Sequence, residues 1–224
     1  MSTVVGTLPR TRLKPRTSPR KDVTPEDLLT MPDGGRFELV DGKLRELKVS
    51  LLSTVIAGEI SLILGRYCRA HHLGWLPSAE LGYQCVSWQP GQVRRADVSF
   101  IRAERVTAER WDEGFCSIPP DLAVEVVSPN DQVDEVDEKI KDYLRAGVKL
   151  IWVVHPVLRA VQVLRTDGTV GWLSSDDELS GEDVIPGFQC RVSDLFPKGA
   201  DAARPKPRSK PPQKGKPRSK GPRS

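Results

Sequence analysis

Lysine and arginine gather at the two ends of this 224-residue chain, and that distribution limits where a folded core can form. Residues 1–21 hold six basic residues and no Asp or Glu, and residues 198–224 hold ten basic residues against one Asp. Between them, residues 22–197 have 18 basic and 29 acidic residues, a net charge of −11. The formal charge of +4 therefore combines an acidic domain with two basic ends.

Both basic ends are predicted to be disordered. Residues 198–224 repeat Lys-Pro-Arg-Ser and Arg-Ser-Lys units and contain no large apolar residue, so they cannot bury enough surface to offset the entropy of ordering. Residues 1–21 have a similar but less extreme composition. We therefore predict a basic arm (1–21), one folded domain (22–197) and a basic tail (198–224). The domain is long enough to bury a full core.

Several protein classes do not fit this composition. The longest purely apolar runs, such as residues 150–154, are far shorter than the roughly 20 residues of a membrane-spanning helix. The N-terminal residues lack the apolar stretch of a signal peptide. The four cysteines are widely spaced without a CxxC pair, and with only three histidines they predict free thiols rather than disulfides or a zinc site. We expect a cytoplasmic protein without a membrane segment.

The first half of the domain contains a hairpin between two helices. Thr24 is placed as the N-cap of a short helix, because Asp27 stands three residues later in the capping-box position. Asp41-Gly42 separates two short apolar runs and predicts a hairpin over residues 37–47. Apolar residues recur at helical spacing over residues 51–68 and predict a longer helix.

The second half alternates strands with one helix. Strands are predicted over residues 95–100, 121–127 and 148–154, and a second hairpin over residues 161–173 with its turn at Asp167-Gly168. Residues 133–144 have helical periodicity, and Gly147 stands where a C-terminal cap belongs. Because residues 148–154 are apolar on both faces, they predict a central strand. The order of elements indicates an α/β or α+β domain with a mixed sheet.

Two acidic residues lie within predicted strands. Glu125 shares a strand face with Ala123 and Val127, and an ionised carboxylate there is costly unless a cation or donor meets it. Asp97 poses the same question more mildly, because it alternates with Ala96 and Val98 but shares its strand face with the polar residues Arg95 and Ser99. Taken singly, each has a structural explanation: a buried ion pair for Glu125 and a solvated strand edge for Asp97.

The helix after Glu125 offers two lysines as the cation. Lys139 borders its apolar face beside Tyr143, although a surface pair with Glu135 would also account for it. Lys141 flanks the opposite border equally well. Periodicity alone does not choose between the two lysines.

These residues resemble the putative restriction endonuclease family, a former domain of unknown function within the PD-(D/E)xK nuclease superfamily. The resemblance covers about 176 of the 224 residues, in order. The matching stretches are Phe-Glu-Leu-Val-Asp-Gly-Lys (37–43), Arg-Ala-Asp-Val-Ser-Phe (95–100), Pro-Asp-Leu-Ala-Val-Glu-Val-Val-Ser-Pro-Asn-Asp (120–131), Lys-Ile-Lys-Asp-Tyr (139–143), Gly-Val (147–148) and Trp-Val-Val-His-Pro (152–156).

The resemblance implies a restriction-endonuclease-like core, in which helices flank a central mixed sheet, and a nuclease-like domain over residues 22–197. It implies that Asp97 and Glu125 are metal ligands, that Glu38 is a further acidic contributor, and that Lys139 is the catalytic lysine. Two positions depart from the superfamily pattern. Ala96 stands where a proline precedes the Asp, and Val127 stands where the lysine is usual, so the lysine must reach in from the helix.

The implied activity is that of a metal-dependent DNA endonuclease. Hard oxygen ligands, here Asp97, Glu125 and the backbone carbonyl that follows Glu125, suit Mg²⁺, with Mn²⁺ as a substitute. An ammonium at Lys139 would assist the attacking water and offset phosphate charge. Glu59, within the apolar stripe of the long helix, is a weaker candidate for the same cluster, and a polar contact between helices is its alternative explanation.

The predicted partner is DNA. Because a domain at −11 repels DNA on average, we expect the basic ends to supply phosphate contacts without sequence preference. Such ends could instead only aid solubility or bind RNA. By family analogy the protein is expected to be a homodimer. The alternatives to a DNA endonuclease are a non-enzymatic DNA- or partner-binding module that kept the fold, and an RNA-directed enzyme.

Overall fold

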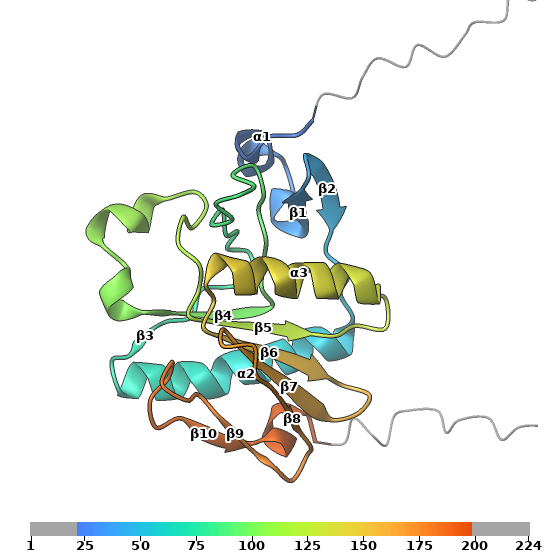
Figure 1. The fold of residues 1–224 in the computed structure, drawn as a ribbon, viewed down its shortest axis with the longest axis vertical. Helices are drawn as coiled ribbons and strands as arrows, with labels where there is room; N and C mark the ends of the chain where they lie inside the picture. Colours follow the sequence, from blue (N-terminus) through green and yellow to red (C-terminus); the bar gives the residue numbers. More distant parts are fainter. Residues whose placement is uncertain (1–21, 199–224) are drawn as a thin grey trace, which may run out of the picture.

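A six-stranded mixed sheet forms the centre of a computed structural model of the chain, which describes residues 22–198 (Figure 1). Its strands, in spatial order, are β3 (Gly74–Trp75), β4 (Val98–Arg102), β5 (Leu122–Val126), β6 (Leu150–His155), β7 (Ala160–Arg165) and β8 (Val170–Leu173). Only β5 and β6 run parallel among these pairs. The predicted α+β class with a mixed sheet is confirmed. The predicted arm (1–21) and all of the predicted tail except Lys198 lie outside the described residues.

Two helices cover opposite faces of this sheet (Figure 1). The long helix α2 (Leu51–Ala70) begins at a capping box formed by Ser50 and Ser53. Helix α3 (Val133–Ala146) connects the parallel strands β5 and β6. It ends at Gly147, whose φ of +90° is the left-handed conformation that glycine adopts without strain. Both helices lie where their periodicity predicted them.

Alternate residues of the central strands point to the two helices. Ile56, Ile60 and Leu64 of α2 belong to one buried cluster, with strand residues Val98, Phe100, Leu122, Val124, Val126, Leu150, Trp152 and Val154. On the other face, Ile140 and Tyr143 of α3 pack with Ala123, Ile151 and Val153. Glu125 has the same parity as Ala123, so it lies on the α3 face. That placement decides which helix can supply its cation.

A separate hairpin stands beside the end of this sheet. It consists of β1 (Phe37–Val40) and β2 (Lys43–Glu46), and the turn residues Asp41 and Gly42 have φ of +50° and +69° as the Asp-Gly signal predicted. The capping box at the start of α1 (Pro25–Thr30) is also confirmed. The remaining elements are β9 (Glu178–Ser180), β10 (Gln189–Arg191) and 3-10 turns at Gly34–Arg36, Ala103–Arg105, Ala108–Asp112 and Val192–Leu195.

The strand predicted from residue 95 differs from the observed one. Strand β4 starts at Val98, because the preceding residues pair elsewhere: Arg94 bonds through its backbone with Tyr83, and the Arg95 N–H donates to Glu38. The strand predicted over residues 148–154 likewise starts later, at Leu150, after the Gly147 cap. Asp97 therefore lies just before its strand rather than inside it.

Two further predictions concern α2 and the thiols. By length and composition α2 could cross a membrane, a property that core helices of water-soluble proteins share, and four of its residues, Ile56, Ile60, Leu64 and Cys68, are buried in the main core. The sequence contains no uninterrupted apolar run of the roughly 20 residues that a membrane-spanning helix needs. Helix α2 is apolar enough on average because its few polar residues are mostly uncharged. All four cysteines are free, as predicted.

Candidate active site

The four residues predicted to form the site line one pocket of about 410 Å³. Asp97 immediately precedes β4, and Glu125 lies near the end of β5. Because these strands are antiparallel and Val98 is opposite Val124, the two carboxylates meet at the same end of the sheet. Glu38 enters from β1 and Lys139 from α3, so four separate elements contribute to the pocket.

Lys139 is the cation that meets Glu125. Its Nζ lies 2.8 Å from Glu125 Oε2 and 3.1 Å from Glu38 Oε1. All three side chains are at most 12% exposed, so these charges are largely removed from water. Burial alone would lower the pKa of Lys139, but Glu125 and Glu38 outweigh it and raise that pKa above its ordinary value. The amine is therefore protonated at neutral pH.

Two arginines also hold the Glu38 carboxylate. Arg94 Nη1 lies 3.0 Å from Glu38 Oε2, and the backbone N–H of Arg95 donates to Oε1 at 2.8 Å. Burial would raise the pKa of Glu38, but Lys139 and Arg94 lower it below its ordinary value. Glu38 therefore stays ionised and helps to fix the position of the lysine.

The other two carboxylates have fewer compensating contacts. Burial and the neighbouring Asp97 raise the pKa of Glu125 to about 8, although Lys139 opposes this shift. Burial also raises the pKa of Asp97, against the effect of Lys139 and of the Val126 N–H that donates to Asp97 Oδ2 at 2.7 Å. Asp97 is half-buried, accepts a hydrogen bond from Val126 and lines the same pocket as Glu125, so it is not a fully solvated residue of a strand edge.

One carboxylate oxygen in the pocket remains available to a cation. Glu125 Oε1 is buried and has no hydrogen-bond partner of ordinary geometry, although the Tyr143 hydroxyl interacts with the same carboxylate. Two neighbouring carboxyl groups are the kind of donor set that Mg²⁺ prefers, since Mg²⁺ binds through one or two carboxylates and keeps several waters. Among residues 22–198, no cluster of three or more His, Cys, Asp or Glu side chains is arranged as a complete metal cage. The residues therefore fit a two-carboxylate site completed by other oxygens.

Two other candidates lie elsewhere. Lys141 is exposed on α3 and does not line the pocket, so the structure separates the two lysines that the helical wheel did not. Glu59 is on α2, which packs against the opposite face of the sheet, and it does not line the pocket either. The polar contact between helices that was its alternative explanation is not observed, because the side chain of Glu59 has no hydrogen bond or ion pair within residues 22–198.

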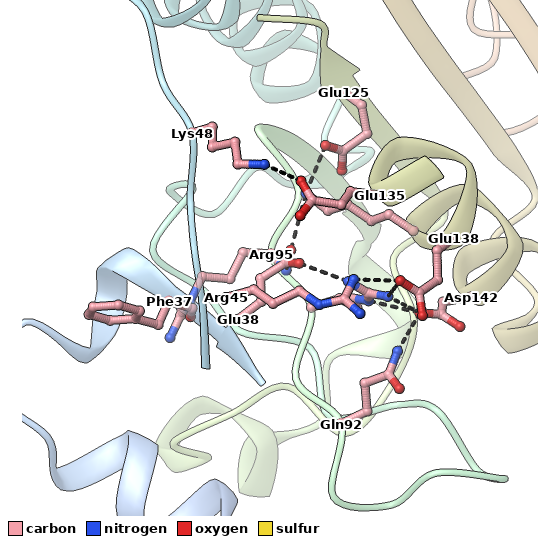
Figure 2. A network of polar contacts seen from close by, with 12 residues as sticks. Phe37, Glu38, Arg45, Lys48, Gln92, Arg95, Glu125, Glu135, Glu138 and Asp142 are labelled. Carbon is pink, nitrogen blue, oxygen red and sulfur yellow. Dashed lines mark hydrogen bonds and ion pairs between the residues drawn. The ribbon is translucent and has the colours of Figure 1, made fainter. Parts of the chain in front are cut away.

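Sequence reasoning missed the polar network behind Glu38 (Figure 2). Arg94 is only 2% exposed and connects Glu38 to Asp142 of α3, with 2.6 Å between Arg94 Nη2 and Asp142 Oδ2. Gln92 also donates to Asp142. The available signal was the charged pair Arg94-Arg95 between the apolar residues Val93 and Ala96, which indicates a buried cation.

Comparison with known proteins identifies the family of the chain. The family described as "Putative restriction endonuclease" matches residues 25–193, three quarters of the chain. The chain belongs to this family. No curated protein matches it.

A solved structure shares the fold of this family member. It is described as a putative nuclease belonging to DUF820 from Anabaena variabilis ATCC 29413, and the TM-score is 0.67 at 18% sequence identity. The match covers 78% of this chain and 97% of the other. Membership of the putative restriction endonuclease family supports a nuclease-like function, and the solved structure supports the corresponding fold.

Proposed function

We propose that the protein is a Mg²⁺-dependent DNA endonuclease that hydrolyses phosphodiester bonds. The observation that carries this proposal is the position of the Lys139 ammonium between Glu125 and Glu38, in one pocket with Asp97. A protonated amine beside two carboxylates with raised pKa values combines a charge-stabilising donor with acidic oxygen ligands.

Asp97, Glu125 and the backbone carbonyl that follows Glu125 would hold the metal. When bound, Mg²⁺, or Mn²⁺ in its place, supplies an activated water and electrostatic stabilisation of the phosphoryl group. Its binding favours the ionised forms of Asp97 and Glu125, which burial disfavours in the metal-free protein.

Lys139 acts in this proposal as a donor rather than as a base. Its ammonium has three N–H donors, of which one bonds to Glu125 while Glu38 is an ion-pair neighbour at 3.1 Å, so at least one donor remains for a water or a phosphate oxygen. Glu38 is anchored by Arg94 and is a second ion-pair partner of Lys139 besides Glu125. It therefore keeps the amine in the pocket. Glu38 is thus a positioning residue.

The remaining parts of the proposal concern partners and setting. We propose DNA as substrate, a cytoplasmic location and a homodimeric state, with additional phosphate contacts from the basic ends of the chain. The alternative is a non-enzymatic DNA- or partner-binding module with the same fold.

The test is cleavage of plasmid DNA, single-stranded DNA and RNA by the purified full-length protein with Mg²⁺, Mn²⁺ or EDTA. We expect cleavage of DNA only with a divalent metal, and loss of both cleavage and metal-induced thermal stabilisation in Asp97→Asn. Binding of DNA without cleavage in any metal would support the non-enzymatic alternative. Preferential cleavage of RNA would make the protein an RNA-directed enzyme.

A further inference from the structure

Two ion pairs bridge the mouth of the active-site pocket. Arg45 of β2 pairs with Glu138 of α3, and Lys48, just after β2, pairs with Glu135 one turn earlier (Figure 2). Arg45, Lys48 and Glu135 line the same pocket as Asp97, Glu125 and Lys139. These contacts therefore connect the hairpin to α3 across the entrance to the candidate site.

Both pairs are accessible to solvent, in contrast to the pairs inside the pocket. Their four side chains are 31–40% exposed, whereas Glu125, Glu38 and Lys139 are at most 12% exposed. Ion pairs with this exposure contribute little to stability, because water screens the charges and the side chains lose conformational freedom. Arg45 and Lys48 can therefore exchange these carboxylates for another anion with little loss of stability.

The inner carboxylates do not depend on these two cations. Glu38 and Glu125 are compensated by Lys139 and Arg94, which remain in place if the hairpin cations move. Glu138 also keeps a second cation, since Arg94 Nη2 lies 3.8 Å from its Oε2. Glu135 is 37% exposed, so water can solvate it after release. Opening the two outer pairs leaves no buried charge unpaired.

We propose that Lys48 and Arg45 form a clamp for the phosphodiester backbone, and that Glu135 and Glu138 compete for it in the free protein. The proposal rests on the proposed function and assigns the residues that receive the substrate's negative charge. A nucleic acid entering this acidic pocket needs cations at the mouth. Lys48 offers a mobile point charge, and Arg45 offers the forked donors that match two phosphate oxygens.

The test measures DNA binding rather than cleavage. A short fluorescein-labelled duplex is titrated with the full-length protein in Ca²⁺, an oxygen-ligated substitute for Mg²⁺, at several salt concentrations. We expect Lys48→Gln to weaken binding by about five- to tenfold and to lower the salt slope by about one. We expect Glu135→Gln to tighten binding about two- to fivefold, since the competing carboxylate is removed.

The double variant Lys48→Gln/Glu135→Gln decides between a clamp and a general charge effect. The clamp requires Lys48, so the gain from Glu135→Gln should vanish in the double variant, which should bind like Lys48→Gln. Additive effects would overturn the proposal. The matched control is Glu113→Gln, which makes the same change in net charge at a pair with Arg110 that is 30% exposed on each side and outside this pocket. If Glu113→Gln tightens DNA binding as much as Glu135→Gln does, the proposal is also overturned.

These results are independent of the proposed catalysis. If the predicted binding pattern appears in a protein that cleaves no DNA, the clamp stands and the nuclease proposal fails. If wild-type protein cleaves DNA and Lys48→Gln binds with unchanged affinity and salt slope, the clamp fails and the nuclease proposal stands.

Discussion

Lys139 Nζ lies 3.1 Å from Glu38 Oε1, and this contact joins helix α3 to the β1–β2 hairpin inside the pocket. The same amine lies 2.8 Å from Glu125 Oε2. One cation thus compensates buried carboxylates from two different sheets. Its loss should affect stability as well as chemistry, because removing one member of a buried ion pair leaves its partner's charge uncompensated.

Lys139→Met should lower the cleavage rate by about a hundredfold or more, the scale of losing one charge-stabilising donor. Lys141→Met, on the exposed side of the same helix, should stay within a few-fold of wild type. Lys139→Met should also lose about 3 kcal/mol of unfolding free energy without metal, and part of this should return with Mg²⁺. Cleavage is compared at a temperature where circular dichroism shows both variants folded. Equal cleavage rates for the two variants would remove the helix-borne lysine from the mechanism.

Glu125→Gln should change how the stability of the metal-free protein depends on pH. The pKa of Glu125 is raised from 4.5 to about 8, so between these values the folded state binds more protons than the unfolded state. The wild-type protein should therefore lose stability as pH rises through this window, by on the order of 3 kcal/mol. In Glu125→Gln the part of this loss that is due to Glu125 should be absent, leaving only that of Asp97, whose pKa burial also raises. Stability at pH 9 should equal or exceed that of wild type, because Glu38 still pairs with Lys139.

Urea unfolding at several pH values between 4.5 and 9 measures this difference. Glu38 contributes in the opposite direction and in a different window: its pKa is lowered, so its contribution is lost only as the solution becomes more acidic than its ordinary value of 4.5. A Glu125→Gln protein that is much less stable than wild type at pH 9 would show that the carboxylate is mainly a structural member of the ion pair.

Arg94→Met should be strongly destabilising. The substitution keeps much of the aliphatic stem but removes the cation that joins Glu38 to Asp142, and about 3–5 kcal/mol is typical when one partner of a buried pair is removed. The control is Arg36→Met, because Arg36 pairs with Glu46 at 67% and 56% exposure and should contribute less than about 1 kcal/mol. Equal midpoints in urea for the two variants would contradict the importance of the network behind Glu38.

Deletion of residues 198–224 should weaken DNA binding and reduce its salt dependence. The segment carries ten basic residues and one acidic residue, and each phosphate contact that is lost removes about 0.9 from the salt slope. The melting temperature should change by no more than about a degree or two, because the family match ends at residue 193. Fluorescence anisotropy and differential scanning calorimetry provide the two measurements. An unchanged slope would exclude the tail from phosphate binding.

Local sequence signals were sufficient for most of the secondary structure. The Asp41-Gly42 turn, the capping box at Thr24 and the glycine cap at Gly147 depend on the conformational preferences of neighbouring residues, and all three are observed. The apolar residues around Glu125 also predict a nearby cation or donor by themselves, because burial of an unpaired carboxylate is costly.

The partners of these residues were decided only by the tertiary structure. Helical periodicity placed Lys139 and Lys141 on opposite borders of one apolar face, and only the docking of α3 on the sheet put Lys139 in the pocket. The same holds for Arg94 and Glu38, whose contact requires β1 to meet the segment before β4. Periodicity determines which side chains leave water, whereas the choice of buried partner depends on how distant elements pack.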